Sequence, residues 1–140
     1  MKKIMGITII ALALVIAIVP LFTDCLSQGK ALTTTTGAIV PMKCHWTSIA
    51  EIGMAVPLGL IGISNLINKR RETFTNNSVF GITLGGLVML FPTVLIGVCA
   101  NPMMLCNMVE RPALLLGGGL AIMANLVTFV NARKMTEMGA

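Results

Sequence analysis

The sequence contains few charged residues, and this shortage excludes most classes of soluble protein. Only 11% of its 140 residues are Asp, Glu, Lys or Arg, whereas 56% are hydrophobic. An ordinary soluble domain carries about 25% charged residues. Because apolar spans of about 20 residues would fill more than half of the chain, we expect one integral membrane domain over residues 1–140.

The chain also lacks the motifs of most enzymes. It has one histidine, His45, and no phosphate-binding loop, and no two carboxylates share one segment. No CxxC pair is present, although membrane thiol oxidoreductases usually carry one. The net charge of +5 is explained by basic cytoplasmic loops rather than by nucleic acid. We therefore expect a non-enzymatic protein without a nucleic-acid partner and predict no resident cofactor.

What is present is a series of long apolar runs, which predicts an all-α bundle of four transmembrane helices. The runs cover about residues 4–23, 47–67, 79–98 and 112–130. Each is long enough to cross a bilayer. The connections make two helical hairpins. The first hairpin loop, residues 24–46, includes four consecutive threonines and is expected to be β-prone and non-helical.

The distribution of basic residues predicts the orientation of the hairpins. One side has Lys2, Lys3, Lys69, Arg70, Arg71, Arg133 and Lys134, whereas the other has Lys30, Lys43 and Arg111. Cytoplasmic loops carry the excess of Lys and Arg. We therefore expect both termini in the cytoplasm and a location in the bacterial cytoplasmic membrane.

The four cysteines all fall on the side predicted to be outside the cytoplasm. Cys25 follows the first span, Cys44 precedes the second, Cys99 closes the third and Cys106 precedes the fourth. Thiols oxidise in such compartments, so we expect structural disulfides that form an extracytoplasmic cap. Pairing within each hairpin is preferred, but crossed pairing between the hairpins stays open.

Two polar segments beside the cysteines hold further candidate functional residues. Glu51 lies about one helical turn inside the membrane, where a carboxylate is costly unless it is paired, protonated or near water. An alternative is that it reaches the interface, and Trp46 is typical of an interfacial anchor. The candidates are His45, Trp46, Glu51, Asn101, Pro102 and Asn107.

Soft ligands in these segments suggest an alternative function. Thiolates, thioethers and imidazole suit Cu(I), and zinc is also possible. A site for Cu(I) or for a haem-like ligand would draw on Met42, Cys44, His45, Met103 and Cys106. Methionine in apolar sequence usually serves packing, however. Membrane thiol oxidoreductase activity is the other alternative.

Glycines at small-xxx-small spacing predict close helix packing. Gly81 and Gly85 show this pattern in the third span, and small residues let membrane helices approach closely. Packing within one bundle is the simpler interpretation. Self-association through a glycine-rich helix face is the alternative.

Two segments of the chain resemble a known family. These are Met42-Lys43-Cys44-His45-Trp46-Thr47, and Cys99-Ala100-Asn101-Pro102-Met103 with Cys106-Asn107. They resemble a family of small four-span bacterial membrane proteins of unknown function, and the similarity covers essentially the whole chain. The resemblance implies an accessory or assembly subunit of a transport complex, such as a MacB-type ABC exporter.

Overall fold

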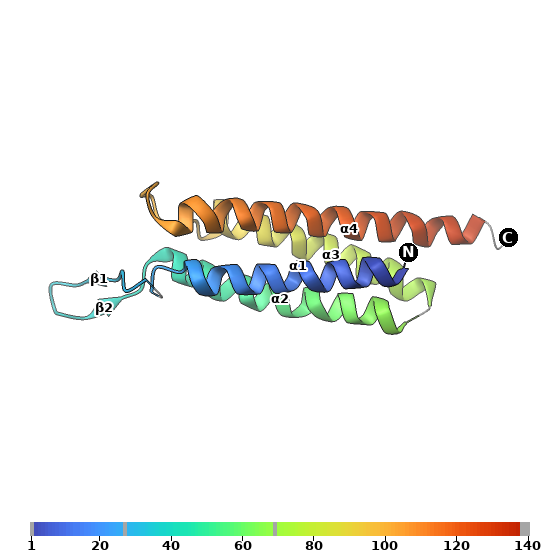
Figure 1. The fold of residues 1–140 in the computed structure, drawn as a ribbon, viewed down its shortest axis with the longest axis horizontal. Coiled ribbons are helices and arrows are strands. Elements are labelled where there is room, and N and C mark those ends of the chain that lie inside the picture. Colours follow the sequence, from blue (N-terminus) through green and yellow to red (C-terminus); the bar gives the residue numbers. More distant parts are fainter. Residues whose placement is uncertain (1, 27, 69, 138–140) are drawn as a thin grey trace.

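The computed structural model describes residues 2–26, 28–68 and 70–137 (Figure 1). Its long helices are α1 (Lys2–Thr23), α2 (Lys43–Ile67), α3 (Arg71–Leu90) and α4 (Arg111–Glu137). Two π-helical turns, η1 (Phe91–Leu95) and η2 (Cys106–Glu110), follow α3 and precede α4. Strands β1 (Leu32–Thr33) and β2 (Ile39–Val40) pair antiparallel in the first loop, with Leu32 opposite Val40.

Four segments are long and apolar enough to cross a membrane, as the sequence predicts. They are Lys3–Thr23, Lys43–Ile67, Arg71–Leu95 and Cys106–Lys134. The chain is therefore a multi-pass membrane protein. The second helix begins at Lys43 rather than near Thr47, and the fourth segment begins at Cys106 rather than near Pro112. As a result, Cys44 and Cys106 lie on helical turns.

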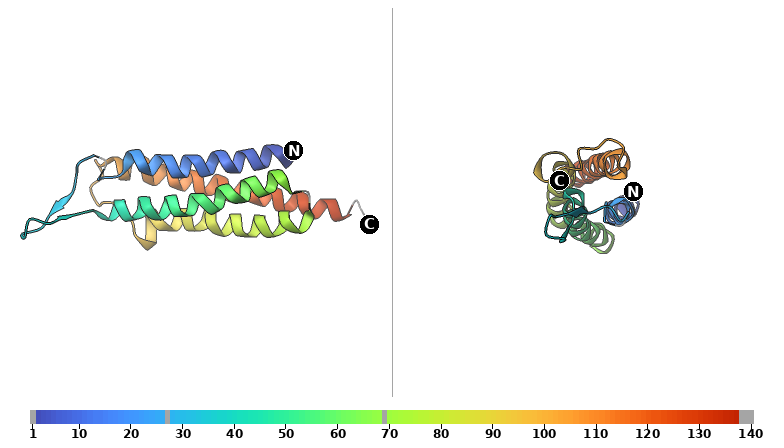
Figure 2. Two further views of the ribbon diagram at one scale, coloured as in Figure 1. Left: turned by 90° about the horizontal axis from the view of Figure 1, so that it is seen from below. Right: turned by 90° about the vertical axis from the view of Figure 1, so that its left-hand side faces the viewer.

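The helices form two hairpins, which confirms the predicted arrangement. Helix α1 packs along α2, and α3 packs along α4, while α1 with α4 and α2 with α3 join the hairpins. The start of α1 and the end of α4 lie at one end of the bundle (Figure 1). The β1–β2 hairpin projects from the other end, which we call the cysteine end (Figure 2).

Glycines hold each hairpin together by close backbone approach. A Cβ atom on Gly62 of α2 would lie 3.0 Å from the Gly6 carbonyl oxygen of α1. A Cβ atom on Gly85 of α3 would lie 3.0 Å from the Gly118 carbonyl oxygen of α4. Membrane helices without a hydrophobic drive associate through such contacts. These glycines therefore serve packing inside the bundle.

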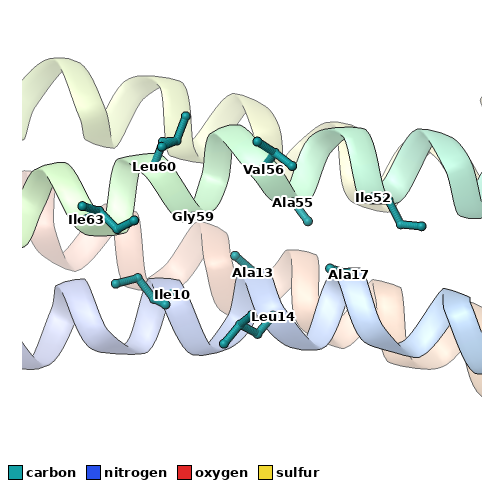
Figure 3. A pocket seen from close by; sticks show the side chains of 10 residues that line it. All are labelled: Ile10, Ala13, Leu14, Ala17, Ile52, Ala55, Val56, Gly59, Leu60 and Ile63. Carbon is teal, nitrogen blue, oxygen red and sulfur yellow. The ribbon is translucent and has the colours of Figure 1, made fainter.

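The core in the middle of the bundle is mainly apolar. Buried side chains from all four helices form its core, namely Ile9, Ala13, Ile16, Ala55, Leu58, Val88, Leu114 and Ala121. A groove of about 300 Å³ lies between α1 and α2, and Figure 3 shows that apolar side chains line it. Because these side chains offer no polar group to a ligand, the groove suits lipid acyl chains. The ionisable groups lie toward the ends, and buried Asn125 within α4 bonds the Ala121 carbonyl oxygen of its own helix.

Candidate functional site

The four cysteines converge at the cysteine end from four separate segments. Cys25 follows α1, Cys44 lies in the first turn of α2, Cys99 lies in the loop after η1, and Cys106 begins η2. Their four Sγ atoms all lie within 4.8 Å of one another. We call this group the cysteine cluster. It connects both hairpins at one point.

Within the cluster, one disulfide pair touches two thiols. Cys25 and Cys44 form the pair, with a Cα–Cα distance of 6.5 Å, which is within the range of protein disulfides. Cys99 and Cys106 are free thiols. The Cys99 Sγ lies 3.2 Å from that of Cys44 and 3.5 Å from that of Cys25. The Cys106 Sγ lies 3.6 Å from that of Cys25.

Access to the cluster is uneven. Cys25, Cys44 and Cys106 are at most 1% exposed, whereas Cys99 is half-buried. Methionines pack around the sulfur atoms, and the Met42 Sδ lies 3.8 Å from the Cys99 Sγ. Cys99 is therefore the member of the cluster that an external reactant can reach.

Gly97 turns the chain so that Cys99 returns to α2. Its φ of 79° is in the left-handed region that favours glycine. Its N–H donates to the Phe91 carbonyl oxygen at 3.0 Å, which closes η1. Its own carbonyl oxygen accepts a hydrogen bond from the Thr47 hydroxyl at 2.8 Å. The loop that carries Cys99 is thereby attached to α2 one turn below Cys44.

A histidine–aspartate contact lies directly beside the disulfide pair. The His45 Nδ1 is 2.7 Å from the Asp24 Oδ2, and the side chains are 23% and 11% exposed. Asp24 precedes Cys25 and His45 follows Cys44 in sequence, so the disulfide brings the two side chains together. Trp46 is 56% exposed and meets the His45 ring edge-on, with ring centroids 5.9 Å apart. Its position fits an interfacial anchor.

Two carboxyl groups are buried beneath the cluster. Glu51 on α2 and Glu110 at the end of η2 are both 0% exposed. The Ser48 hydroxyl lies 3.1 Å from the Glu110 Oε1 and 2.9 Å from the Cys44 carbonyl oxygen. In the described part of the chain, both oxygens of Glu51 and the Oε2 of Glu110 lack a hydrogen-bond partner. Buried carboxylates without partners are costly.

The remaining predicted residues lie mostly outside this centre. Asn101 and Pro102 are exposed in the loop, where the Asn101 side-chain oxygen accepts a hydrogen bond from the Met103 N–H. Met103 is 81% exposed and does not reach the sulfur atoms. Asn107 is half-buried, and its N–H bonds the Met104 carbonyl oxygen at 3.0 Å.

Of the metal-ligand set expected from the sequence, the structure brings together Cys44 and Cys106, with Met42 beside them. His45 instead bonds Asp24. Sequence reasoning overlooked Asp24 and Glu110. The sequence could have indicated both residues, because Asp24 adjoins Cys25 and Glu110 follows Cys106 by one helical turn.

The arrangement permits two kinds of sulfur chemistry. A thiolate in contact with a disulfide can attack it, which is thiol–disulfide exchange. Alternatively, four reduced thiolates can surround a tetrahedral metal ion. A Zn–S distance of about 2.3 Å would place the sulfur atoms about 3.8 Å apart. The Cys25–Cys44 bond would have to be reduced and its sulfur atoms separated, while the other contacts of 3.2–3.6 Å would widen slightly.

Comparison with known proteins gives a family but no characterised relative. No curated protein and no solved structure matches the chain. The sequence pattern of one protein family matches residues 4–131, which is most of the chain. The chain therefore belongs to the family defined by the domain of unknown function DUF4418, as a four-helix membrane protein with a cysteine cluster.

Proposed function

We propose that this protein is a membrane thiol–disulfide exchange protein whose working centre is the cysteine cluster. One observation supports this proposal above the others: a disulfide pair touches two thiols, and one of those thiols is accessible. If the four cysteines formed two purely structural disulfides, the sulfur atoms of one disulfide would not need to touch those of the other. Contact is what exchange requires, because a thiolate must reach a disulfide sulfur atom.

The outer pair, Cys99 and Cys106, reacts with the partner. The Cys99 thiolate attacks a partner disulfide, forms a mixed disulfide and releases one partner thiolate. The Cys106 thiolate then attacks Cys99, which forms a Cys99–Cys106 disulfide and releases the second partner thiolate. The partner gains two electrons and two protons, and the cluster loses the same. With a partner dithiol, every step runs in reverse.

The inner pair, Cys25 and Cys44, exchanges only with the outer pair. Both of its sulfur atoms are buried, so an external thiol cannot attack them directly. The Cys99 Sγ lies 3.2 Å from the Cys44 Sγ. The Cys99 thiolate can therefore attack this sulfur atom, form a Cys99–Cys44 disulfide and release Cys25 as a thiolate. This step moves one disulfide within the cluster and needs no external oxidant. The oxidised inner pair thus stores an oxidising equivalent, because its disulfide can accept two electrons.

The reaction partner is a protein segment on the cysteine side of the membrane. The β1–β2 hairpin projects there and exposes apolar side chains on both strands, with Ile39 70% and Leu32 58% exposed. Such an edge suits contact with another polypeptide. Following the basic-residue bias, we place this end outside the cytoplasmic membrane of a bacterium.

This partner contact is also compatible with the accessory role in a transport complex that the family resemblance implies. A MacB-type ABC exporter subunit would then be the protein that the cluster oxidises, reduces or assembles. Co-purification in mild detergent at native expression tests this part separately. A monomer without a bound partner would contradict the accessory role and leave the exchange chemistry to its own test.

Trapping of the mixed disulfide tests the exchange chemistry. Purified Cys106→Ser protein is incubated with oxidised glutathione, quenched with acid and examined by intact mass and peptide mapping. We expect one glutathione on Cys99, because the residue that resolves the mixed disulfide is absent. Wild-type protein should instead release two reduced glutathione molecules for each Cys99–Cys106 disulfide formed.

Cys99→Ser is the matched control and should accept no glutathione. Peptide mapping also reports the cysteine pairs before the reaction. Four cysteines locked in two fixed pairs that neither exchange nor accept glutathione would refute the proposal. That result would return the cysteine end to a structural cap.

A tetrathiolate metal centre is the second candidate. It is favoured by the mutual approach of all four Sγ atoms within 4.8 Å, which exchange by itself does not require. The reduced cluster would hold a soft ion such as Cu(I) or Zn²⁺ through sulfur. The Met42 thioether beside Cys99 adds a soft atom for Cu(I).

Metal analysis of reduced, anaerobically purified protein tests this second candidate. We expect one tightly held ion for each chain if it is correct, and loss of the ion on oxidation, since disulfides consume the thiolates. A Cys44→Ser variant should lose the ion, whereas His45→Ala should keep it. A metal-free reduced protein that does not bind added Zn²⁺ or Cu(I) would rule out the metal centre.

A further inference from the structure

The exchange proposal leaves two buried groups unexplained, the carboxyls of Glu51 and Glu110. Both are fully buried inside the bundle, and together they have three oxygen atoms without a hydrogen-bond partner among the described residues. No described Lys, Arg or His side chain forms a salt bridge with either one. An ionisable group in a membrane helix without such a partner points to function.

Geometry connects these carboxyls to the sulfur atoms. Cys106 and Glu110 begin and end η2, one turn apart, and both side chains are fully buried. Side chains four residues apart share a helix face. From α2, the Ser48 hydroxyl reaches both the Glu110 Oε1 and the carbonyl oxygen of Cys44. Glu110 therefore lies between the cluster and the deeper Glu51.

Charge also ties the groups together. Glu110 interacts electrostatically with Cys106 on its own element, with Asp24 at the end of α1 and with Glu51 on α2. Two neighbouring carboxylates cannot both stay ionised in a low-dielectric site. A pair of carboxyls that shares one proton therefore has the capacity to accept a second.

We propose that Glu110, with Glu51 behind it, is the proton acceptor and donor of the cysteine cluster. This inference rests on the proposed thiol–disulfide exchange. Exchange needs a thiolate, and a buried thiol can lose its proton only to a group inside the protein. Glu110 is the buried acid on the same element as Cys106, whereas Asp24, the other buried acid beside the cluster, contacts His45.

The proton balance closes within the site. The Cys106 thiol gives its proton to the Glu110 carboxylate, and the sulfur takes up the negative charge. After this thiolate has attacked a disulfide, the released thiolate takes the proton back from Glu110. The buried site carries a single negative charge throughout, either on the carboxyl pair or on sulfur. No second charge has to be buried at any step.

Infrared difference spectroscopy gives a test that does not depend on an external partner. The full-length protein in lipid nanodiscs is reduced with a phosphine, and the change in the carbonyl stretch of protonated carboxyl groups is recorded. We expect a carboxyl band that changes on reduction in wild-type protein and is absent in Glu110→Gln. A reduction-insensitive carboxyl region, or the same band in the variant, would overturn the proposal.

Exchange kinetics give the second readout. With oxidised glutathione as the probe, Glu110→Gln should slow the reaction of the reduced cluster by about 100-fold, the lower range for loss of an acid–base group. The pH dependence of the rate should also change, whereas Glu110→Asp should restore part of the rate. Glu72→Gln, at an exposed position on α3 far from the cluster, is the matched control.

The two proposals fail in different ways. If wild-type protein does not exchange with glutathione, the exchange function fails, and the infrared band alone decides the role of Glu110. If wild-type protein exchanges and Glu110→Gln has the same rate and pH profile, the proton role fails and the function stands. Unchanged thermal unfolding of Glu110→Gln would show that a slower rate does not come from misfolding.

Discussion

The two ends of the bundle use different polar chemistry. At the end opposite the cysteines, neutral side chains of α2 and α3 bond one another: the Asn77 amide donates to the Ser64 hydroxyl at 3.0 Å and to the Asn65 side-chain oxygen at 2.9 Å. At the cysteine end, buried acids lie beside reactive sulfur atoms. Amides and hydroxyls are the ordinary means of joining membrane helices.

This difference in polar chemistry indicates which end of the bundle serves packing and which serves function. A neutral network stabilises the bundle without changing its charge, and it needs no other explanation. Two buried carboxyls do not improve on apolar packing, because burial of an ionisable group opposes stability. We therefore assign activity to the cysteine end and packing to the opposite end. Stability measurements can test this assignment.

The largest effect should come from the disulfide pair. Cys25→Ala combined with Cys44→Ala opens the loop that contains the β1–β2 hairpin and should lower the unfolding free energy by about 3 kcal/mol, as expected for a loop of this size. Thermal unfolding in detergent measures the change. The control, Cys99→Ala with Cys106→Ala, removes no covalent loop and should cost less. Equal losses would mean that the cluster acts as one structural unit.

The sequence predicted the four helices and the two hairpins because both depend on hydropathy and loop length. The sequence also predicted that all four cysteines lie on the same side of the membrane. It did not predict the cluster, because the approach of all four cysteines depends on how the two hairpins pack on each other, through contacts distant in sequence such as the hydrogen bond from the Thr47 hydroxyl to the Gly97 carbonyl oxygen. Met103 shows what residue type alone cannot predict. Its thioether suggested a metal ligand, but its position in the loop leaves the side chain exposed.

Backbone packing at the opposite end should give the next largest effect. A Cβ atom on Gly62 would lie 2.7 Å from the Ile10 Cγ1 and 3.0 Å from the Gly6 carbonyl oxygen. Gly62→Ala should therefore destabilise the protein by about 1–3 kcal/mol through overpacking. Gly53→Ala on the same helix meets nothing within 4 Å and should be neutral. Denaturant titration measures the unfolding free energy of both variants. Equal stability of Gly62→Ala and Gly53→Ala would contradict the role of Gly62 in close packing.

Isosteric apolar substitutions should have opposite signs at the two ends. Glu51→Leu removes a buried carboxyl without a hydrogen-bond partner in the described structure and should stabilise the protein by about 1 kcal/mol. Asn65→Leu removes the acceptor of the Asn77 amide and should destabilise it by about 1 kcal/mol. Matched thermal unfolding curves measure both. Marked destabilisation by Glu51→Leu would reveal a ligand, such as a cation, held by the carboxyl.

The smallest effect should come from the Asp24–His45 pair, because solvent reaches it at the partly exposed His45 side chain. Such pairs contribute at most about 1 kcal/mol. Asp24 has further interactions, so a double-mutant cycle of Asp24→Asn and His45→Gln is needed to isolate the coupling. The disulfide holds the two residues together through their neighbours Cys25 and Cys44. We therefore expect the coupling in oxidised protein and its loss after reduction. A coupling that survives reduction would show that helix packing, rather than the disulfide, places His45 against Asp24.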